Sequence, residues 1–269
     1  MSDTSMRKSG PPSPRERQHR GTVGIAYAVA AYASFLAVAG YSVAFLADAV
    51  VPLTIDRGGQ EASPVVAITI NALLFALFCL QHSVMARPAF KQWWSRIVPT
   101  HVERATYVLA TSVALAFIYW QWRPMPSVIW DLQADALRAV VWAVSMLGWV
   151  LVVAMTFVFS HAEFLGLKQP IQHRRGEAPG PPQLLMPLPF RLVRHPLMTG
   201  FLIAFWVTPT MTVGHVVFAA LSTIYILVGV KYEERDLLAN LPGYADYAAR
   251  TPRFFPRFRR ATTRATVSP

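Results

Sequence analysis

The chain has 269 residues, of which 54% are hydrophobic and 14% are charged, and its formal net charge is +11. With a mean hydropathy of +0.36, this composition argues against an ordinary soluble domain and favours an integral membrane protein. A basic excess is also found in nucleic-acid-binding proteins, so its distribution along the chain has to decide between the two.

The N-terminal segment, residues 1–21, is polar and rich in Pro, Ser and Arg. Such a composition cannot bury enough apolar surface to fold alone, so we expect disorder here. We do not expect a cleaved signal peptide, because the apolar block that follows is too long for the hydrophobic region of one.

Apolar residues then form five blocks, and each of the first four has about the 20 residues that a bilayer crossing requires. The fifth is too long for one crossing and contains Pro209, which interrupts a helix. We therefore expect a helical hairpin with arms at 196–208 and 211–231, the first arm being short. The five blocks occupy residues 22–47, 64–86, 105–122, 137–160 and 196–231.

These blocks predict an all-α fold, a polytopic membrane bundle of four long transmembrane helices plus the C-terminal helical hairpin. One domain covers residues 22–258, and residues 259–269 form a basic, flexible tail. The lone Cys79 lies within the second helix, so neither an intrachain disulfide nor a cysteine-based zinc site is possible, and we expect no metal.

The positions of Lys and Arg predict the orientation, because these residues are enriched on the cytoplasmic side. Of the 25, 22 lie in the N-terminal segment, in loops 86–104 and 161–195, and from Lys231 onward. Six helices with both termini cytoplasmic, in a multi-pass inner (plasma) membrane protein, satisfy this distribution. The net charge is therefore explained by topology, and we expect no nucleic-acid partner. The mixed aromatic and basic residues 253–260 suit an anionic lipid surface.

Ionisable residues gather at the predicted cytoplasmic ends of four segments. Charge is costly in a membrane and commonly marks a functional site. Each residue alone has a simpler explanation, since helix-end histidines are often only hydrogen-bonded and arginines can be topological anchors. Their coincidence at one face favours a small zwitterionic ligand. The clusters are Gln81-His82-Ser83, His161 with Glu163, Arg194-His195, and Glu233-Glu234-Arg235.

The run Arg194-His195-Pro196-Leu197-Met198-Thr199-Gly200 resembles the R-H-P-x-Y-x-G signature of isoprenylcysteine carboxyl methyltransferases and related membrane methyltransferases. Met198 departs from it by replacing the usual Tyr. Glu233-Glu234 and the later Gly243, Tyr244 and Tyr247 are similar to two further elements of that superfamily. Its members bind S-adenosylmethionine at the cytoplasmic face of a helical bundle. The resemblance implies a donor site formed by Arg194, His195, Pro196, Gly200, Glu233, Glu234 and Tyr247.

Residues 80–88, 160–167 and 204–215 resemble motifs of the branch that contains methanethiol S-methyltransferase, and the resemblance covers about residues 25–258. It implies that a small thiol is methylated, with methanethiol giving dimethyl sulfide, and no obligatory protein partner is inferred. A prenylated or lipid-like acceptor is an alternative. A non-enzymatic, denitrification-associated membrane protein is another alternative, because such proteins share much of the pattern. No dinucleotide or P-loop motif is present, so a nucleotide-like cofactor requires a membrane-type site.

Methyl transfer to a thiol requires a thiolate, and a free cysteine thiol has a pKa of roughly 8.5. His82 and His161 are the candidate bases, because imidazole titrates near pH 6.5. His82 is favoured by its position beside Gln81 and Ser83, and Glu163 is a residue that could orient a histidine. For the donor, a carboxylate pair suits the ammonium group and a cationic group suits the carboxylate.

Two other functions stay open at this point. A haem-binding membrane protein would use histidines as axial ligands, and His82, His161, His195 and His215 supply that residue type. However, His215 lies beyond Pro209, away from the others. A transporter or sensor would place polar residues along a path through the bilayer, where the sequence offers little beyond Asn71.

Overall fold

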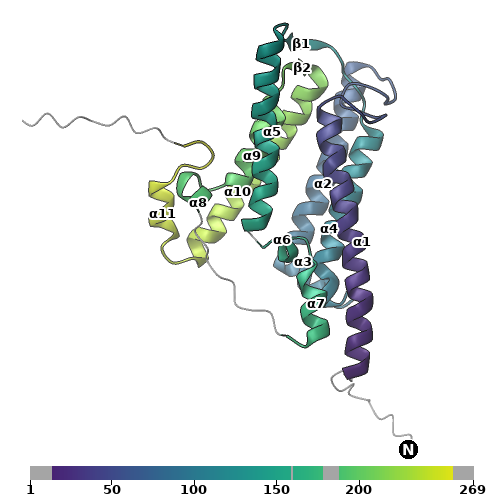
Figure 1. Cartoon of the computed structure of the whole chain (residues 1–269), viewed down its shortest axis with the longest axis vertical. Coiled ribbons are helices and arrows are strands. Elements are labelled where there is room, and N and C mark those ends of the chain that lie inside the picture. The colour runs from purple at the N-terminus through teal and green to yellow at the C-terminus, as the bar shows by residue number, and fades with distance from the viewer. Residues whose placement is uncertain (1–13, 159, 178–187, 257–269) are drawn as a thin grey trace, which may run out of the picture.

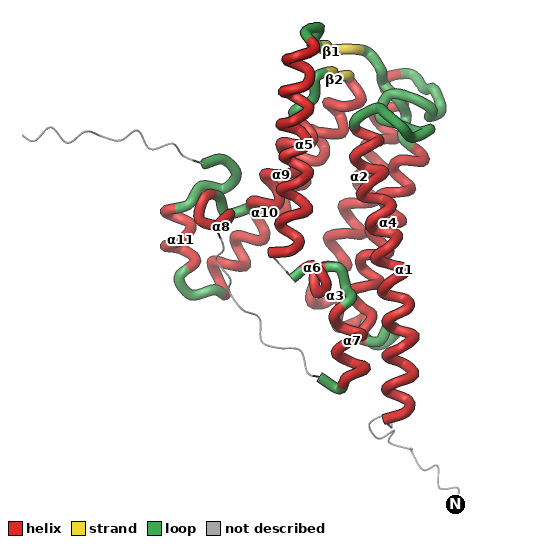
Figure 2. The backbone as a smooth tube through the Cα atoms, in the orientation of Figure 1, coloured by secondary structure: helices red, strands yellow, loops and turns green. Residues whose placement is uncertain are grey.

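A computed structural model describes residues 14–158, 160–177 and 188–256. The chain forms a bundle of helices with two short strands at one end (Figures 1 and 2). The elements are α1 (Pro14–Leu46), α2 (Pro64–Ala86), α3 (Pro88–Trp94), α4 (Thr100–Gln121), β1 (Val128–Asp131), α5 (Asp135–Val158), α6 (His161–Phe164), α7 (Lys168–Arg175), α8 (Leu188–Leu192), α9 (Pro196–Trp206), β2 (Thr210–Thr212), α10 (Val213–Asn240) and α11 (Tyr244–Arg250).

Five of the described helices, α1, α2, α4, α5 and α10, are long and apolar enough to cross a membrane. The predicted polytopic helical bundle is therefore confirmed, and the protein is a multi-pass membrane protein. The hairpin is also present, because α9 and α10 correspond to its two expected arms and the chain between them contains Pro209.

The short arm α9 has 11 residues, which is about 16 Å of helix and only half of a hydrocarbon core. The chain then leaves the helix and continues to β2, and an extended chain covers about 3.3 Å per residue. β2 pairs antiparallel with β1, with Asp131 opposite Thr210. Because β1 lies between α4 and α5, the arm ends at the same face as that loop. This strand pairing was not predicted.

The N-terminal segment differs from the expectation of disorder over residues 1–21, because α1 begins at Pro14. The extra turns are supported by α7. A Cβ at Gly21 would lie 2.6 Å from the Cβ of Arg174, and one at Gly24 would lie 3.2 Å from Pro170. This packing stabilises helix where composition alone indicated none. Residues 1–13 and the predicted tail 259–269 lie outside the described residues.

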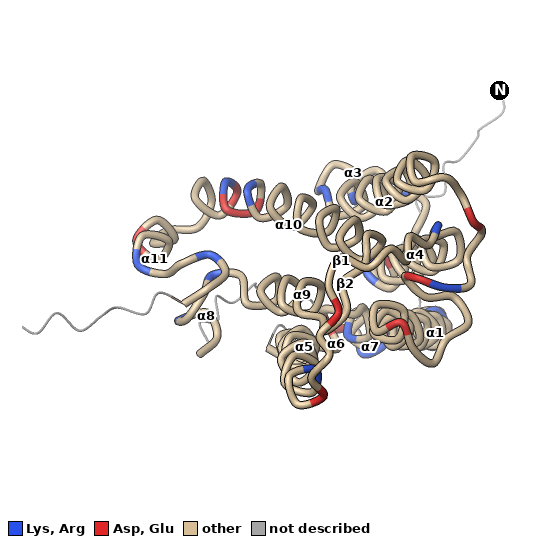
Figure 3. The backbone as a smooth tube through the Cα atoms, turned by 90° about the horizontal axis from the view of Figure 1, so that it is seen from above, with Lys and Arg blue, Asp and Glu red and all other residues tan. Residues whose placement is uncertain are grey.

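The aromatic core lies in the half of the bundle nearer the strands. Phe45, Phe75, Trp122 and Phe205 surround Phe218, with ring centroids 5.3 to 6.3 Å from it. These rings come from α1, α2, the residue directly after α4, and α9, so they fix the strand end of α10 against its neighbours. Toward its carboxyl end, α10 runs away from α2 and α4 toward α8 and α11 (Figures 1 and 3).

Helices α5 and α9 approach very closely through glycine. A Cβ at Gly200 would lie 2.8 Å from the carbonyl oxygen of Gly148, and a Cβ at Gly148 would lie 2.8 Å from the carbonyl oxygen of Gly200. Small residues allow helix backbones to approach in this way within membranes. The contact holds α9 in place and so positions the residues at its start.

Candidate active site

The start of α9 and the end of α10 meet in an ion-pair network centred on Glu234. Its carboxylate is buried, with 8% of the side chain exposed, and accepts hydrogen bonds from Arg194 at 2.8 Å and His195 at 3.2 Å on one oxygen. Its other oxygen accepts from Arg253 at 2.9 Å. A buried carboxylate is tolerated because these cationic groups and donors surround it. Four of the predicted residues, Arg194, His195, Glu233 and Glu234, therefore lie together.

Arg194 is fully engaged inside the protein. Two of its nitrogens contact Glu234, and the third donates to the backbone carbonyls of Ala248 and Thr251, each at 2.6 Å. The backbone N–H groups of Arg194 and His195 also donate to the carbonyls of Pro252 and Arg253. Arg194 therefore fastens α9, α10 and the chain after α11 together, and it has little capacity left for a ligand.

Glu233 and Arg253, in contrast, are partly free at the edge of the network. The Glu233 side chain is 53% exposed, and its described ion-pair contact is with His195 at 3.5 Å. The Arg253 side chain is 55% exposed, and Glu234 engages two of its three nitrogens. The partly free carboxylate of Glu233 and the free edge of the Arg253 guanidinium can together bind a ligand that carries both charges. Acidic and basic segments gather at this end of α10 in Figure 3.

An open pocket of about 350 Å³ adjoins Arg194 and Arg253 and is otherwise lined by Ala248, Ala249, Thr251 and Pro252. Nearby, the Tyr244 hydroxyl is buried without a hydrogen-bond partner among the described residues. Burial raises the pKa of Tyr244 to about 12, with Glu234 adding to the effect, so the phenol stays protonated and can donate. An unpaired buried donor is costly, which suits a group that a ligand completes.

The remaining residues of the predicted donor site support its shape. Pro196 is buried at the first turn of α9, Gly200 packs against α5, and the Tyr247 hydroxyl donates to the Phe190 carbonyl at 2.6 Å, joining α11 to α8. Met198, where the signature has Tyr, packs in an apolar cluster with Leu202 of α9 and residues of α10.

His82 lies in a second cluster, formed by α2, α4 and α10. Its Nε2 is 2.8 Å from the Tyr107 hydroxyl and its Nδ1 is 3.2 Å from the Thr111 hydroxyl. The ring stacks on Phe78 and lies 6.2 Å from the ring of Tyr225. Both nitrogens thus face hydroxyl groups, which fixes the imidazole and makes Tyr107 the first proton partner of His82.

His161 lies in a different cluster, between the middle of α1 and the end of α5. Its two nitrogens contact the hydroxyls of Tyr32 at 2.9 Å and Thr156 at 2.7 Å, and its ring stacks on Phe157. Glu163 was expected to orient a histidine, but its half-exposed carboxylate instead pairs with Lys168 at 2.7 Å. Hydroxyl groups therefore hold His161 without help from that carboxylate.

Helix α10 connects the His82 cluster to the Glu234 network. The Tyr225 hydroxyl is 3.1 Å from the Ser83 hydroxyl, and the guanidinium of Arg87 lies over the ring of Tyr232. Tyr225 precedes Glu233 by eight residues, which is about 12 Å along a helix. The two clusters are therefore about two helical turns apart on one element.

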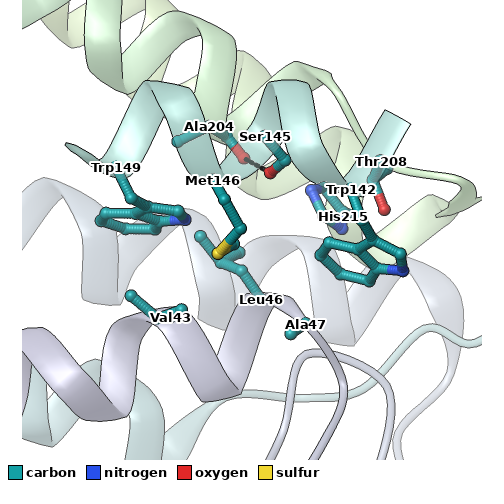
Figure 4. A pocket seen from close by; sticks show the side chains of 10 residues that line it. All are labelled: Val43, Leu46, Ala47, Trp142, Ser145, Met146, Trp149, Ala204, Thr208 and His215. Atoms are coloured by element: carbon teal, nitrogen blue, oxygen red, sulfur yellow. Dashed lines mark hydrogen bonds between the residues drawn. The ribbon is translucent and has the colours of Figure 1, made fainter. Parts of the chain in front are cut away.

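A second cavity lies between α1, α5 and α9, nearer the strands (Figure 4). Its volume is about 10 Å³, room for about one water molecule, and two tryptophans, Trp142 and Trp149, line it. His215 also borders it, with Nε2 2.8 Å from the Phe205 carbonyl. His215 therefore caps the end of α9 near the strands. It lies away from His82, His161 and His195, which does not favour a shared haem.

Comparisons with known proteins agree with this arrangement. The family model described as NnrU protein matches residues 71–239. A methanethiol S-methyltransferase of Mycobacterium tuberculosis is 47% identical over 234 residues, covering 86% of this chain and 95% of the relative. Methanethiol S-methyltransferase 1 of Bradyrhizobium diazoefficiens is 45% identical over 236 residues, covering 87% of this chain and 82% of the relative.

The chain belongs to the methanethiol S-methyltransferase family. Nurim of Mus musculus is more distantly related, with 32% identity over 187 residues, 66% of this chain and 71% of the relative. No solved structure matches the chain. The family resemblance that the sequence motifs indicated is thus confirmed.

Within this member of the methanethiol S-methyltransferase family, two contributors were missed from the sequence. Arg253 was assigned to a lipid-binding segment, although it directly follows Thr251 and Pro252, whose carbonyls Arg194 contacts. Tyr107 lies 25 residues from His82 in the chain, and an aromatic residue inside an apolar helix gives no local signal. The one indication in the sequence was His82 itself, because a histidine inside an apolar helix needs a hydrogen-bonding partner.

Proposed function

We propose that this protein is an S-adenosylmethionine-dependent methyltransferase that methylates a small thiol, with methanethiol giving dimethyl sulfide. The observation that carries the proposal is the pair of partly free charges, Glu233 and Arg253, held in place by buried Glu234. The methanethiol S-methyltransferases among its relatives support the choice of acceptor.

The residues fit the amino-acid end of the donor. Glu233 binds the ammonium group, and the free edge of Arg253 binds the carboxylate, next to the open pocket. Glu234 fixes Arg194, His195 and Arg253 and so keeps both ligand-binding groups in position. Tyr244 supplies an additional donor from its unpaired hydroxyl. When bound, S-adenosylmethionine supplies an electrophilic methyl group that a thiolate sulfur accepts in an in-line displacement.

His82 serves the acceptor. Tyr107 donates its hydroxyl hydrogen to Nε2 of His82, while Nδ1 donates to Thr111. In this arrangement the phenol oxygen of Tyr107 accepts a proton from the thiol as its own proton moves to His82, leaving a thiolate. The surrounding Phe78 and Tyr225 rings exclude water, which favours a desolvated nucleophile. His161 is the second candidate, with Tyr32 in the corresponding position.

We further propose an inner (plasma) membrane location with both termini cytoplasmic. This orientation is supported by the positions of Lys and Arg, because 22 of the 25 lie in the segments expected to be cytoplasmic. It places the Glu234 network at the cytoplasmic face, where the donor is dissolved. A thiol as small and apolar as methanethiol can reach the His82 cluster from the bilayer.

Purified protein incubated with S-adenosylmethionine and a panel of thiols, followed by mass spectrometry of the products, tests the function. We expect dimethyl sulfide from methanethiol, and slower or no methylation of long alkyl or prenylated thiols. Preferred methylation of a prenylated thiol would move the assignment to the alternative acceptor class. Binding of haem, seen as a Soret band, without any methyl transfer would refute the proposal.

A further inference from the structure

Gly229 lies on α10 midway between the two clusters, four residues after Tyr225 and four before Glu233. Residues four apart lie one above the other on a helix face. Tyr225 contacts Ser83 and lies beside His82, whereas Glu233 contacts His195. Gly229 is therefore the middle of a helix face whose two ends belong to the candidate acceptor and donor sites.

Neither packing nor backbone conformation requires glycine at this position. No described atom lies within 4 Å of a Cβ built on Gly229, whereas at Gly148 and Gly200 a Cβ would lie 2.8 Å from backbone atoms. Gly229 also lies in the middle of α10, away from the glycines with positive φ. Glycine destabilises a helix interior relative to alanine, so this exposed position carries glycine without a packing reason and leaves open space beside α10.

Gly229 is itself exposed, but it lies on a different side of α10 from the exposed apolar stripe of that helix. Ile224, Leu227 and Val228 form that stripe, with exposures of 59%, 48% and 48%. At about 100° per residue, the middle of their stripe is about 150° around the helix from Gly229. α9 packs on Ile226 and Val230, and α2 contacts Tyr225. Gly229 points between these two helices.

We propose that the space beside Gly229 receives the sulfonium end of the methyl donor, which makes Gly229 the residue that sets the room for the reacting atoms. This inference rests on the proposed methyltransferase function and deepens it. In S-adenosylmethionine, four single bonds separate the ammonium nitrogen from the sulfur, a span of about 5 Å. Four residues of helix rise about 6 Å.

With the ammonium group at Glu233, the sulfur therefore lies level with Gly229. One further turn along α10 are Tyr225 and, across from it, Ser83 and His82, where the thiol is expected. A side chain at position 229 would project into the path between donor and acceptor. Because Gly229 has no side chain, the path between the donor site and the acceptor site stays open.

The test compares Gly229→Ala and Gly229→Leu with the same changes at Gly40 of α1, where a Cβ also meets no described atom within 4 Å. Three quantities are measured for each purified variant: the thermal midpoint without ligands, the calorimetric affinity for S-adenosylmethionine, and methyl transfer to methanethiol. All four variants should melt at or above the wild-type temperature. Gly229→Leu should bind the donor at least tenfold more weakly, Gly229→Ala less so, and the Gly40 variants should match wild type.

Wild-type donor affinity and turnover in Gly229→Leu would overturn the inference and leave the proposed function intact. Unchanged donor affinity with a raised KM for the thiol would assign the space to the acceptor and also overturn it. If the wild-type protein itself neither binds S-adenosylmethionine nor methylates a thiol, the proposed function fails, and the inference fails with it.

Discussion

Arg194 and Glu234 meet at 2.7 Å although 40 residues separate them in the chain. The pair joins the start of α9 to the end of α10, so the two motifs that bracket the hairpin are halves of one structural unit. Adjacent carboxylates then have different roles. Glu234 is enclosed by cations and holds the network, whereas Glu233, one residue earlier, points to its exposed edge.

The first prediction separates these two glutamates. Glu233→Gln should leave the thermal midpoint near wild type and weaken S-adenosylmethionine binding at least tenfold, about 1.4 kcal/mol. Glu234→Gln should weaken binding and also lower the thermal midpoint, because buried Arg194 loses its counter-charge, at a cost of about 3 kcal/mol or more. Calorimetry and thermal unfolding in detergent measure the two effects.

Glu177→Gln is the control, since Glu177 pairs with Arg175 at an exposed site far from the network along the chain. It should change neither quantity. Equal loss of stability in both glutamate variants, with donor affinity preserved, would show that the whole bracket is structural.

The helices of this fold were predictable because each apolar block is long enough to define a crossing by itself, and Pro209 marked the break of the last one. The β1–β2 pairing was not, since Asp131 and Thr210 lie 79 residues apart and strands of three or four residues leave no periodic pattern. The start of α1 at Pro14 depends on packing against α7, which composition does not record.

The candidate site was predictable in its residue types but not in its division of roles. The sequence identified Glu233 and Glu234 as a pair, yet which of them is buried depends on the phase of α10 relative to α9. Similarly, Gly200 belongs to the signature that suggests donor binding, while in the structure it packs against the backbone of α5. Such distinctions arise from tertiary contacts.

Gly200 therefore provides the second prediction. Gly200→Val would force a side chain against the Gly148 carbonyl, and overpacking of this kind destabilises by about 1–3 kcal/mol. We expect a lower thermal midpoint, measured by light scattering or intrinsic fluorescence on heating in detergent. Gly229→Ala, which has open space around it, is the matched comparison. A Gly200→Val protein as stable as wild type would mean that α5 and α9 can separate at no cost.

The third prediction concerns pH and the face that carries the strands. Burial raises the pKa of Asp56 to about 6, although a hydrogen bond from Thr212 opposes the shift. The unfolded value is about 3.9, so the folded state favours the protonated carboxyl group. Its stabilising contribution is complete below about pH 4 and is lost as pH rises through about 6.

Asp56→Asn should consequently gain thermal stability relative to wild type as the pH is raised from 5 to 8. Asp131→Asn should show no such trend, because hydrogen bonds from Thr210 and Arg138 lower the pKa of Asp131, which keeps its titration below this range. Parallel melting curves for Asp56→Asn and wild type across the range would contradict the assignment.

The fourth prediction concerns orientation. A reporter that is active only in the cytoplasm should be active when it is fused to the C-terminus, because the segment from Lys231 onward carries eight of the basic residues. A reporter placed in the loop that contains Arg57 should behave oppositely. Activity of the C-terminal fusion in the periplasm would exclude the six-crossing arrangement.

The fifth prediction assigns the base. His82→Ala should leave donor affinity nearly unchanged, because Tyr225, which lies beside His82, is about two helical turns from Glu233, while methyl transfer falls by roughly 10²–10⁴-fold. The residual rate should increase with pH as the thiol ionises on its own. Tyr107→Phe should also slow transfer, since it removes the hydroxyl that contacts Nε2 of His82, and the effect of the two changes together should be less than additive.

His161→Ala is the matched control, because His161 is likewise held between two hydroxyl groups but lies against α1 and α5 instead of α10. Steady-state rates from pH 6 to 9 with saturating donor provide the comparison. If His82→Ala keeps wild-type turnover across this range and His161→Ala does not, Tyr32 and His161 take over the roles given to Tyr107 and His82. If both variants keep it, the thiol must reach the site already ionised, and turnover should then follow the thiol's own pKa when a more acidic thiol replaces methanethiol.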